Sequence, residues 1–343
     1  MSAPGPGAIS RRRWLALLLV AVVVLGAVTV YAVQAFARYQ ERTTGASAAV
    51  LTEQLQGTGR IVFRNTALGE GYGQVASVAL DDPAGPRQLS AMACDRVDAT
   101  GEYLACLRTE RGIPTIFSTT VLDGQGRSAA QWPLAGIPSR TRISESGLVA
   151  TTAFVTGHSY AADSFSTETT IRSVAGEDYG NLEDFTIMVD GRQLTAMDRN
   201  VWGVTFASDQ VFYATVASGG TTWLVEGNLA QRRMKSVIVN AECPSISPDG
   251  STVAYKKRRD QAGLAHWDIA LLDLATGKET VIPLPRGFDD QLEWLDEGTL
   301  LFGMPRAGAV GDNDVYRIEA AEQAVPQLFI EHAWSPSVVR PAQ

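Results

Sequence analysis

A turn residue followed at once by a short apolar run recurs six times after residue 58. The successive turn residues are 42, 46, 62, 41 and 48 positions apart. The six starts are Gly59 before RIVF, Gly101 before EYLACL, Gly147 before LVATTAF, Asp209 before QVFYATV, Gly250 before STVAY and Gly298 before TLLFGM. A four-stranded blade of a β-propeller takes about 40 to 50 residues, so this spacing predicts six blades, one of them enlarged.

Two more strand-like segments follow each start, with the alternation and the β-branched and aromatic residues typical of strands. The first set covers residues 74–80, 115–122, 169–174, 221–227, 268–274 and 314–320, and the second set covers residues 87–92, 127–134, 192–197, 235–241, 278–284 and 326–333. A two-layer β-sandwich also uses many short strands, but the regular spacing disfavours it. The sequence therefore predicts an all-β, six-bladed β-propeller over residues 59–340.

The two ends of the repeat array predict how the ring closes. The first repeat begins at Gly59 with what corresponds to the second strand of a blade, so its innermost strand is missing upstream. The C-terminal segment AWSPSVV (333–339) is similar to CPSISP, the innermost strand of the fifth repeat. An unpaired sheet edge invites aggregation, so we expect the C-terminal segment to complete the first blade. The enlarged repeat holds two polar segments, 157–168 and 175–185, which we expect to project as loops.

The N-terminal region predicts a membrane anchor. Residues 14–33 form twenty uncharged positions, which as a helix rise about 30 Å, the hydrocarbon thickness of a bilayer. Arg11, Arg12 and Arg13 precede them, which favours a cytoplasmic N-terminus. We therefore expect a cytoplasmic tail (1–13), a single-pass signal-anchor helix (14–36), a stalk (37–58) and an extracytoplasmic propeller.

The alternative to an anchor is a cleaved signal peptide with its A-x-A-like site at 35–37, although the apolar run is long for a signal peptide. No cysteine follows the run to support a lipoprotein anchor.

The charge distribution argues against a nucleic-acid partner. The formal charge of −8 divides into +3 over residues 1–58 (five arginines, two glutamates) and −11 over the rest (24 basic, 35 acidic). Such an acidic body has no surface that attracts phosphates. The run KKRR at 256–259 is a local exception, which we interpret as a solvated loop between strands.

The three cysteines fit an exported protein. Cys94 and Cys106 lie six residues on either side of Thr100, so a hairpin centred there would place them opposite one another. Cross-strand partners can meet disulfide geometry, and an oxidising compartment allows the bond. Cys243 has no partner in its own hairpin, because Tyr255 stands where Cys106 stands in the other repeat. We interpret Cys243 as a buried free thiol.

One repeat carries a family resemblance. The segment SISPDG (245–250), followed by AY and by DIALLDLATGKETVIPL (268–284), resembles the PD40 or WD40-like repeat of TolB-type propellers. The sixth repeat is similar to a lesser degree, and the others only in pattern. The resemblance covers residues 59–340 and implies a six-bladed propeller of the cell envelope that binds other proteins. TolB itself has an α/β domain before its propeller and no anchor, so its particular partners are not carried over.

A search for chemical motifs leaves no site to assign: we expect no catalytic residues, no cofactor and no metal, and so no enzyme. GHSYA (157–161) approaches a nucleophile elbow but is not followed by a helix. His158, His266 and His332 occupy unrelated places in their repeats. The acidic pairs in GDND (311–314) and at 289–290 could hold a cation, but turn residues before a strand explain both.

The leading hypothesis is a monomeric, membrane-tethered propeller that acts as a protein-binding scaffold, with an unidentified envelope protein as partner. The alternative is an enzyme or small-ligand binder that uses the central channel, and a third is a sensor or stability module. Carboxylates with raised pKa values around the axis would favour the enzyme, and an exposed aromatic patch would favour the scaffold. The candidates for that patch are Trp223, Trp267, Trp294 and Trp334.

Overall fold

The computed structural model describes residues 11–42, 49–51, 59–155, 166–260 and 265–341. Helix α1 (Arg11–Arg42) and the propeller are separate compact units. Within the described residues α1 is the one helix long and apolar enough to cross a membrane, over Arg11–Gln34. It covers the predicted anchor and continues into the predicted stalk.

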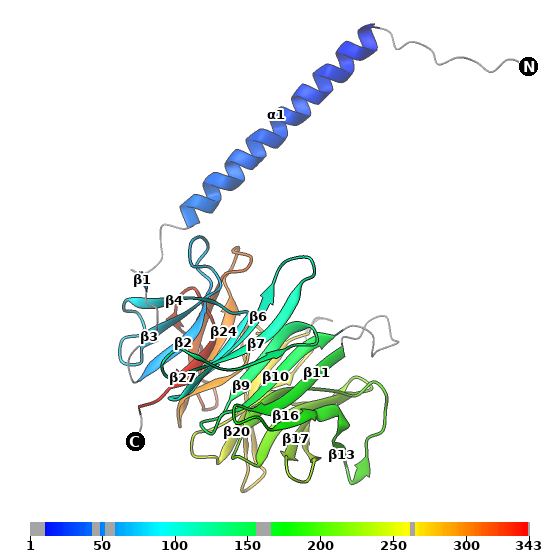
Figure 1. Ribbon diagram of the computed structural model, residues 1–343, viewed down its shortest axis with the longest axis vertical. Coiled ribbons are helices and arrows are strands. Elements are labelled where there is room, and N and C mark those ends of the chain that lie inside the picture. The colour runs from blue at the N-terminus through cyan, green and yellow to red at the C-terminus, as the bar shows by residue number, and fades with distance from the viewer. Residues whose placement is uncertain (1–10, 43–48, 52–58, 156–165, 261–264, 342–343) are drawn as a thin grey trace, which may run out of the picture. The chain divides into compact units, whose positions relative to one another are not determined.

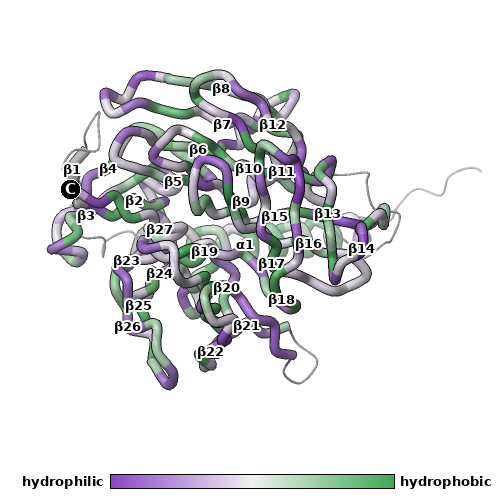
Figure 2. Tube along the Cα trace, turned by 90° about the horizontal axis from the view of Figure 1, so that it is seen from below, coloured by the Kyte–Doolittle hydropathy of each residue, from purple (hydrophilic) through white to green (hydrophobic). Residues whose placement is uncertain are grey.

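Six sheets make up the β-sheet unit, and each has four or more strands (Figure 1). The innermost strands of blades 1 to 6 are β27 (Ala333–Val339), β5 (Arg96–Ala99), β9 (Ile137–Ile143), β15 (Asn200–Phe206), β19 (Glu242–Ile246) and β23 (Glu293–Asp296). In Figure 2 the strands β5, β9, β15, β19 and β27 lie around the centre, with β8, β22 and β26 at the periphery. The six-bladed propeller predicted from the repeat spacing is confirmed.

The outer strands follow the predicted segments in nearly every repeat. The second strands are β2 (Arg60–Asn65), β6 (Tyr103–Glu110), β10 (Leu148–Val155), β16 (Val211–Ser218), β20 (Thr252–Arg258) and β24 (Thr299–Pro305). The third strands are β3 (Gln74–Ala79), β7 (Ile116–Asp123), β11 (Ser166–Ser173), β17 (Thr221–Asn228), β21 (Trp267–Asp273) and β25 (Asn313–Glu319). The fourth strands are β4 (Arg87–Ala93), β8 (Ser128–Pro133), β12 (Asp178–Asn181), β18 (Arg233–Val239), β22 (Glu279–Ile282) and β26 (Gln327–Ile330).

The ring closes as predicted. Strand β27 pairs antiparallel with β2, from Arg60 opposite Val339 to Asn65 opposite Ala333. The first blade thus takes its innermost strand from the C-terminal end of the chain. It also gains a fifth strand, because β1 (Ala49–Leu51) pairs in parallel with β4. Part of the predicted stalk is therefore a strand of the propeller.

The prediction for the enlarged repeat was wrong in two places. Residues 175–185 do not project: they contain β12 and the 3-10 helix Leu182–Asp184, whose Leu182 is fully buried. Residues 192–197 are not the outer strand of blade 3, because only Arg192–Gln193 form a strand, β14, paired with β13 (Thr186–Val189) on blade 4. An outermost strand has water on one edge, so it tolerates the polar sequence DYGN and loses the alternating pattern. Residues 156–165, within the other expected loop, lie outside the described residues.

The hydrophobic core lies between the blades and not at the centre of the ring. The described residues form six buried clusters, and each joins two neighbouring blades. Leu148 and Ile171 of blade 3 pack with Phe212 and Val225 of blade 4, for example. Because each sheet buries both faces in this way, the inner edges of the sheets are left to line a polar channel.

The disulfide joins the predicted cysteines, but by a different route. Cys94 and Cys106 are bonded, with their Cα atoms 5.5 Å apart. In the hairpin of β5 and β6, however, Cys106 lies opposite Val97, and Cys94 precedes β5. The predicted cross-strand register was therefore wrong: the bond ties the connection between blades 1 and 2 to β6. Cys243 is unpaired and buried, as predicted.

Candidate functional site

The channel has two chemically different ends, which we name after the chain segments that form them. The hairpin mouth is formed by the turns that join each innermost strand to the second strand, residues 100–102, 144–147, 207–210, 247–251 and 297–298. The linker mouth is the opposite end, where the chain enters each innermost strand from the preceding blade. A cavity of about 410 Å³ lies at each mouth.

Charged side chains on two innermost strands, β5 and β9, line the channel toward both ends. Arg96 and Asp98 are two positions apart on β5, and Arg140 and Arg142 are two positions apart on β9. Residues i and i+2 of a strand share a face, so each pair points to the same side. Arg140 lines the cavity at the linker mouth, whereas Asp98 and Arg142 line the one at the hairpin mouth.

Blades 3 and 6, on opposite sides of the ring, are bonded to one another across the channel. The backbone N–H of Thr141 donates to Gln291 Oε1, and Gln291 Nε2 donates to the Thr141 carbonyl, both at 3.4 Å. Arg142 donates to the Leu292 carbonyl, and Arg140 Nη2 to Asp289 Oδ1 at 3.0 Å. These bonds cross the channel and tie the innermost segments of opposite blades together.

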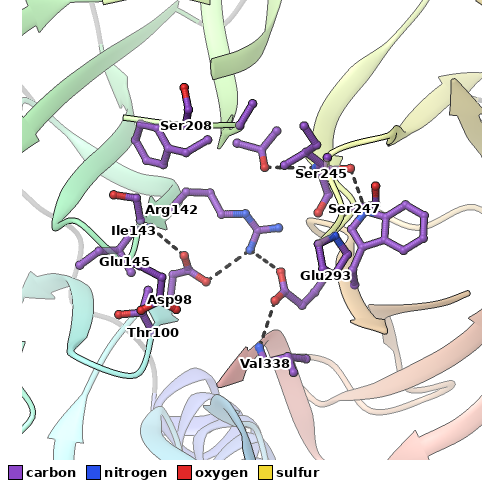
Figure 3. A pocket seen from close by; sticks show the side chains of 18 of the residues that line it. Asp98, Thr100, Arg142, Ile143, Glu145, Ser208, Ser245, Ser247, Glu293 and Val338 are labelled. Carbon is purple, nitrogen blue, oxygen red and sulfur yellow. Dashed lines mark hydrogen bonds and ion pairs between the residues drawn. The ribbon is translucent and has the colours of Figure 1, made fainter. Parts of the chain in front are cut away.

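Arg142 lies between two carboxylates at the floor of the hairpin mouth (Figure 3). Its Nη1 is 3.3 Å from Asp98 Oδ1 and 3.0 Å from Glu293 Oε2. The other carboxylate oxygens accept backbone hydrogen bonds, Asp98 Oδ2 from Ile143 at 2.7 Å and Glu293 Oε1 from Val338 at 3.0 Å. The three side chains come from blades 2, 3 and 6, so this charged triad joins three blades.

Burial and neighbouring charges both shift the pKa values of Glu293 and Arg142. Burial raises the pKa of Glu293, Arg142 opposes the shift and Asp98 adds to it. Burial lowers the pKa of Arg142, but the charges of Glu293 and Asp98 outweigh it and the net shift is upward. A carboxylate with a raised pKa is a candidate acid. Here Asp98 and Glu293 both pair with the guanidinium group of Arg142, and both accept backbone N–H groups. The triad therefore has a structural role, because it joins the three blades.

Above this floor, the rim of the hairpin mouth carries exposed acids. Glu145 and Asp209 line the cavity, and Arg340 is the basic residue beside them. The turns of the other blades add Glu102, Asp249 and Glu297, all exposed. The backbone N–H of Asp249 donates to Glu297 Oε2 at 3.3 Å, which joins the rims of blades 5 and 6. The mouth is therefore an acidic hollow with serine hydroxyls along its wall, among them Ser245 and Ser247.

The linker mouth holds buried cations between aromatic side chains. Lys256 is 2% exposed, and its Nζ lies 2.6 Å from Asp289 Oδ1 and 4.7 Å from the centre of the Trp267 ring. Phe154 and Trp202 complete the apolar wall. Burial raises the pKa of Asp289, but Lys256 and Arg140 outweigh it, so the net shift is downward.

Asp290 points into the protein next to Asp289. It is fully buried, and its Oδ2 accepts the backbone N–H groups of Gly303 at 3.0 Å and Ser335 at 3.1 Å. Burial raises its pKa, while Arg96 and Arg140 oppose the shift. Asp290 thus fixes the start of β27 to β24.

Sequence reasoning misplaced two of the charged segments in this channel. Asp289 and Asp290 do precede a strand, β23, but Asp290 is fully buried and Asp289 pairs with Lys256 and Arg140. The basic run 256–259 is not a solvated loop, because Lys256 lies on β20 and points into the channel. Arg96, Asp98, Arg140 and Arg142 were missed altogether. The sequence does contain a signal for them: in RVD and RTR, two charged residues stand two positions apart on an innermost strand, and therefore on the same face.

Blades 5 and 6 each contain an arginine–aspartate ion pair that the sequence reasoning also missed, and in each pair the aspartate is buried. Arg259 Nε lies 2.6 Å from Asp268 Oδ2, and Arg306 Nε lies 2.9 Å from Asp314 Oδ2. In both blades a histidine joins the group: His266 bonds Asp268 at 3.2 Å, and His332 donates its backbone N–H to Asp314 at 2.9 Å. Asp312 of the GDND segment accepts from His332 Nδ1 at 2.8 Å. The two histidines nevertheless come from different places in their repeats, as predicted: His266 precedes the third strand of blade 5, whereas His332 follows the fourth strand of blade 6. GDND does more than turn the chain, because Asp312 binds His332.

The remaining candidates do not form a site in the described part of the chain. The four tryptophans form no exposed patch: Trp294 is buried, and Trp223, Trp267 and Trp334 are partly buried. GHSYA with His158 lies outside the described residues. Over the described ranges, no three His, Cys, Asp or Glu side chains are grouped to hold a metal ion.

Comparisons with known proteins agree with the architecture. No protein-family model and no curated protein matches the sequence. Among solved structures, TolB from Acinetobacter baumannii superposes with a TM-score of 0.55 at 13% identity, over 82% of this chain and 67% of that one. A chain of a nidogen/laminin complex gives a TM-score of 0.53 at 11% identity, over 82% of this chain and 98% of that one. At these identities the likeness concerns the fold: the chain carries a six-bladed β-propeller similar to that of TolB.

Proposed function

We propose that the protein is a membrane-tethered, extracytoplasmic scaffold that binds another protein at the hairpin mouth. The observation that carries the proposal is the acidic hollow of about 410 Å³, formed by turns from several blades above the bonded triad. Its floor is fixed by Arg142, so the surface is rigid before a partner arrives. A preorganised surface loses little entropy on binding.

The charge of this surface defines the partner chemically. Exposed carboxylates from five blades surround the hollow: Glu102, Glu145, Asp209, Asp249 and Glu297. A segment with lysine or arginine side chains complements such a rim, and long-range attraction would speed its association. The proposed partner is therefore an envelope protein with a basic docking segment.

Two further features support the proposed location. The apolar part of α1 is long enough to span a bilayer, and Arg11 to Arg13 stand before it. The Cys94–Cys106 bond suits an oxidising compartment. We propose a cytoplasmic tail over residues 1–13, an uncleaved anchor over 14–36 and an exported propeller.

The second candidate is an enzyme or ligand binder that uses the channel. The raised pKa values of Asp290 and Glu293, both caused mainly by burial, favour it. Against it, both carboxylates accept backbone hydrogen bonds inside the protein, as described above.

Site-specific photo-crosslinking in intact membranes tests the scaffold. A photoreactive amino acid replaces Glu145 or Asp209 at the rim, and Ser128 on the exposed outer strand β8 serves as the matched control. The same discrete product from both rim positions, absent from the control and identified by mass spectrometry as an envelope protein, would support the proposal. Identical products at all three positions would contradict it.

A further inference from the structure

The cavity at the linker mouth has the walls and the charges of a small-ligand site. Its volume of about 410 Å³ falls within the range of ligand pockets. The walls are mainly apolar, with Phe154, Trp202 and Trp267, while Arg140 and Lys256 supply positive charge. Such a combination suits a molecule with an apolar body and one anionic group.

The two cations share a single carboxylate oxygen. Asp289 Oδ1 is 3.0 Å from Arg140 Nη2 and 2.6 Å from Lys256 Nζ. Both cationic side chains are more than nine-tenths buried, whereas the side chain of Asp289 is 74% exposed. A buried cation needs a counter-ion, and here that counter-ion comes from the solvent side. It is therefore a group that an incoming anion can replace or supplement.

One donor of Arg140 is left without a partner in the described part of the chain. Its Nε is buried and has no hydrogen-bond partner among the described residues, although the sulfur of Cys243 lies near the guanidinium. A thiol is a weak acceptor and does not compensate fully for a buried charged donor. The Nε and Nη2 edge of arginine matches the two oxygens of a carboxylate.

Three cations lie at this end of the channel, together with the carboxylates of Asp289 and Asp290. Arg96 lies at the same end of the channel, stacked over the Trp334 ring at 5.6 Å. Burial lowers its pKa to about 10, and the charge of Arg140 contributes to the shift. Asp290 and Asp289 oppose that shift; Asp289 lines the cavity, whereas Asp290 is buried inside the protein. Glu242 at the rim is engaged, since its Oε1 accepts from Trp267 Nε1 at 3.0 Å.

We propose that the linker mouth binds a carboxylate carried on an aromatic or branched apolar body, with its oxygens on Arg140 and Lys256 and its body against Trp202 and Trp267. Asp289 occupies the position of that carboxylate when the site is empty. The acid can be a free small molecule or the C-terminal residue of a peptide. The inference is independent of the scaffold proposal, which concerns the opposite mouth.

Isothermal titration calorimetry on the full-length protein in detergent micelles tests this site. The probes are N-acetylphenylalanine, its amide, a Gly-Gly-Gly-Phe peptide with a free C-terminus, the amidated peptide, and inorganic phosphate. We expect the acids to bind at least about 10-fold more tightly than the amides, since a charge-assisted hydrogen bond is lost. Binding of the free acid alone indicates a small-molecule ligand, and binding of the peptide alone indicates a protein terminus. Equal binding of acids and amides, tighter binding of phosphate, or no binding of either acid would overturn the proposal.

Two variants change the affinity in opposite directions. Asp289→Asn removes the competing charge and should tighten acid binding several-fold, a gain that misfolding cannot imitate. Lys256→Met should weaken it by about 10-fold, whereas Lys278→Met, which removes an exposed lysine from an outer turn, should leave it unchanged. If Asp289→Asn binds the acid no more tightly than the natural protein, the proposal fails.

Discussion

The two ends of the channel use ion pairs in opposite ways. At the hairpin mouth Arg142 is buried with two carboxylates that are 6% and 15% exposed, so cation and anions are withdrawn from water together. At the linker mouth Lys256 and Arg140 are buried, but their partner Asp289 faces solvent. A pair with both partners buried is costly to break, and a pair with one partner in water can exchange that partner. The ion pairs of the hairpin mouth therefore keep that end rigid, whereas at the linker mouth an incoming anion can replace Asp289.

The largest effect should come from Arg142→Met. The substitution leaves Asp98 and Glu293 buried without their cation, which costs about 3–5 kcal/mol of unfolding free energy. Chemical denaturation monitored by tryptophan fluorescence measures it. A loss below about 1 kcal/mol would show that the two mouths do not differ in the way described.

The disulfide is the next largest contribution, and it acts on the connection between blades 1 and 2. Replacing both Cys94 and Cys106 by serine should lower the unfolding free energy by about 3 kcal/mol, because the unfolded chain is no longer looped. Reducing the natural protein should give the same loss. Unchanged stability in both experiments would contradict this account.

Lys256→Met should cost much less than Arg142→Met. Its partner Asp289 stays in water, and the methionine side chain can pack on Trp267, so we expect a loss of about 1 kcal/mol or less. The same denaturation curves give this value. Equal losses for the two variants would remove the contrast between the mouths.

Charge reversal at the rim should affect binding but not stability. With the photoreactive amino acid at Glu145, Glu102→Lys together with Asp209→Lys repels the proposed basic partner, and both positions are exposed. We expect crosslinked product to fall by about 10-fold while the unfolding free energy changes by less than about 0.5 kcal/mol. Lysine at Glu177, an exposed acid in the turn after β11, is the control that should leave the crosslink intact.

The smallest effects concern pH, and they have opposite signs at the two mouths. The pKa of Glu293 is raised in the folded state, so stability falls as pH rises above the unfolded value of 4.5. The pKa of Asp289 is lowered, so its contribution is present above pH 3.8 and is lost as pH falls through the folded value. These pH-dependent losses are absent from variants that lack the carboxyl group. The unfolding free energy of Glu293→Gln, minus that of the natural protein, should therefore increase as the pH rises. The same difference for Asp289→Asn should increase as the pH falls. Thermal unfolding from pH 3 to 8 measures both, and parallel profiles would be inconsistent with this assignment.

The part of the fold that depends on local pattern was predictable from the sequence. Turn residues such as Gly250 followed by apolar runs mark the second strands, and their spacing gave the number of blades. The closing strand 333–339 was also predictable, since it is similar to another innermost strand and the first repeat lacked one. Outer strands were less predictable: DYGN of β12 has one edge in water and needs no apolar alternation.

The sequence by itself determined the repeat, the six blades, the closure and the identity of the bonded cysteines, because these follow from strand periodicity and residue spacing. Only the tertiary structure decided which polar residues line the axis. Residues 140–142 and 289–293 are about 150 positions apart, and neither segment carries an apolar pattern that marks it as interior. Their burial arises because the ring places opposite innermost strands around one channel, where charges from blades 3 and 6 neutralise one another.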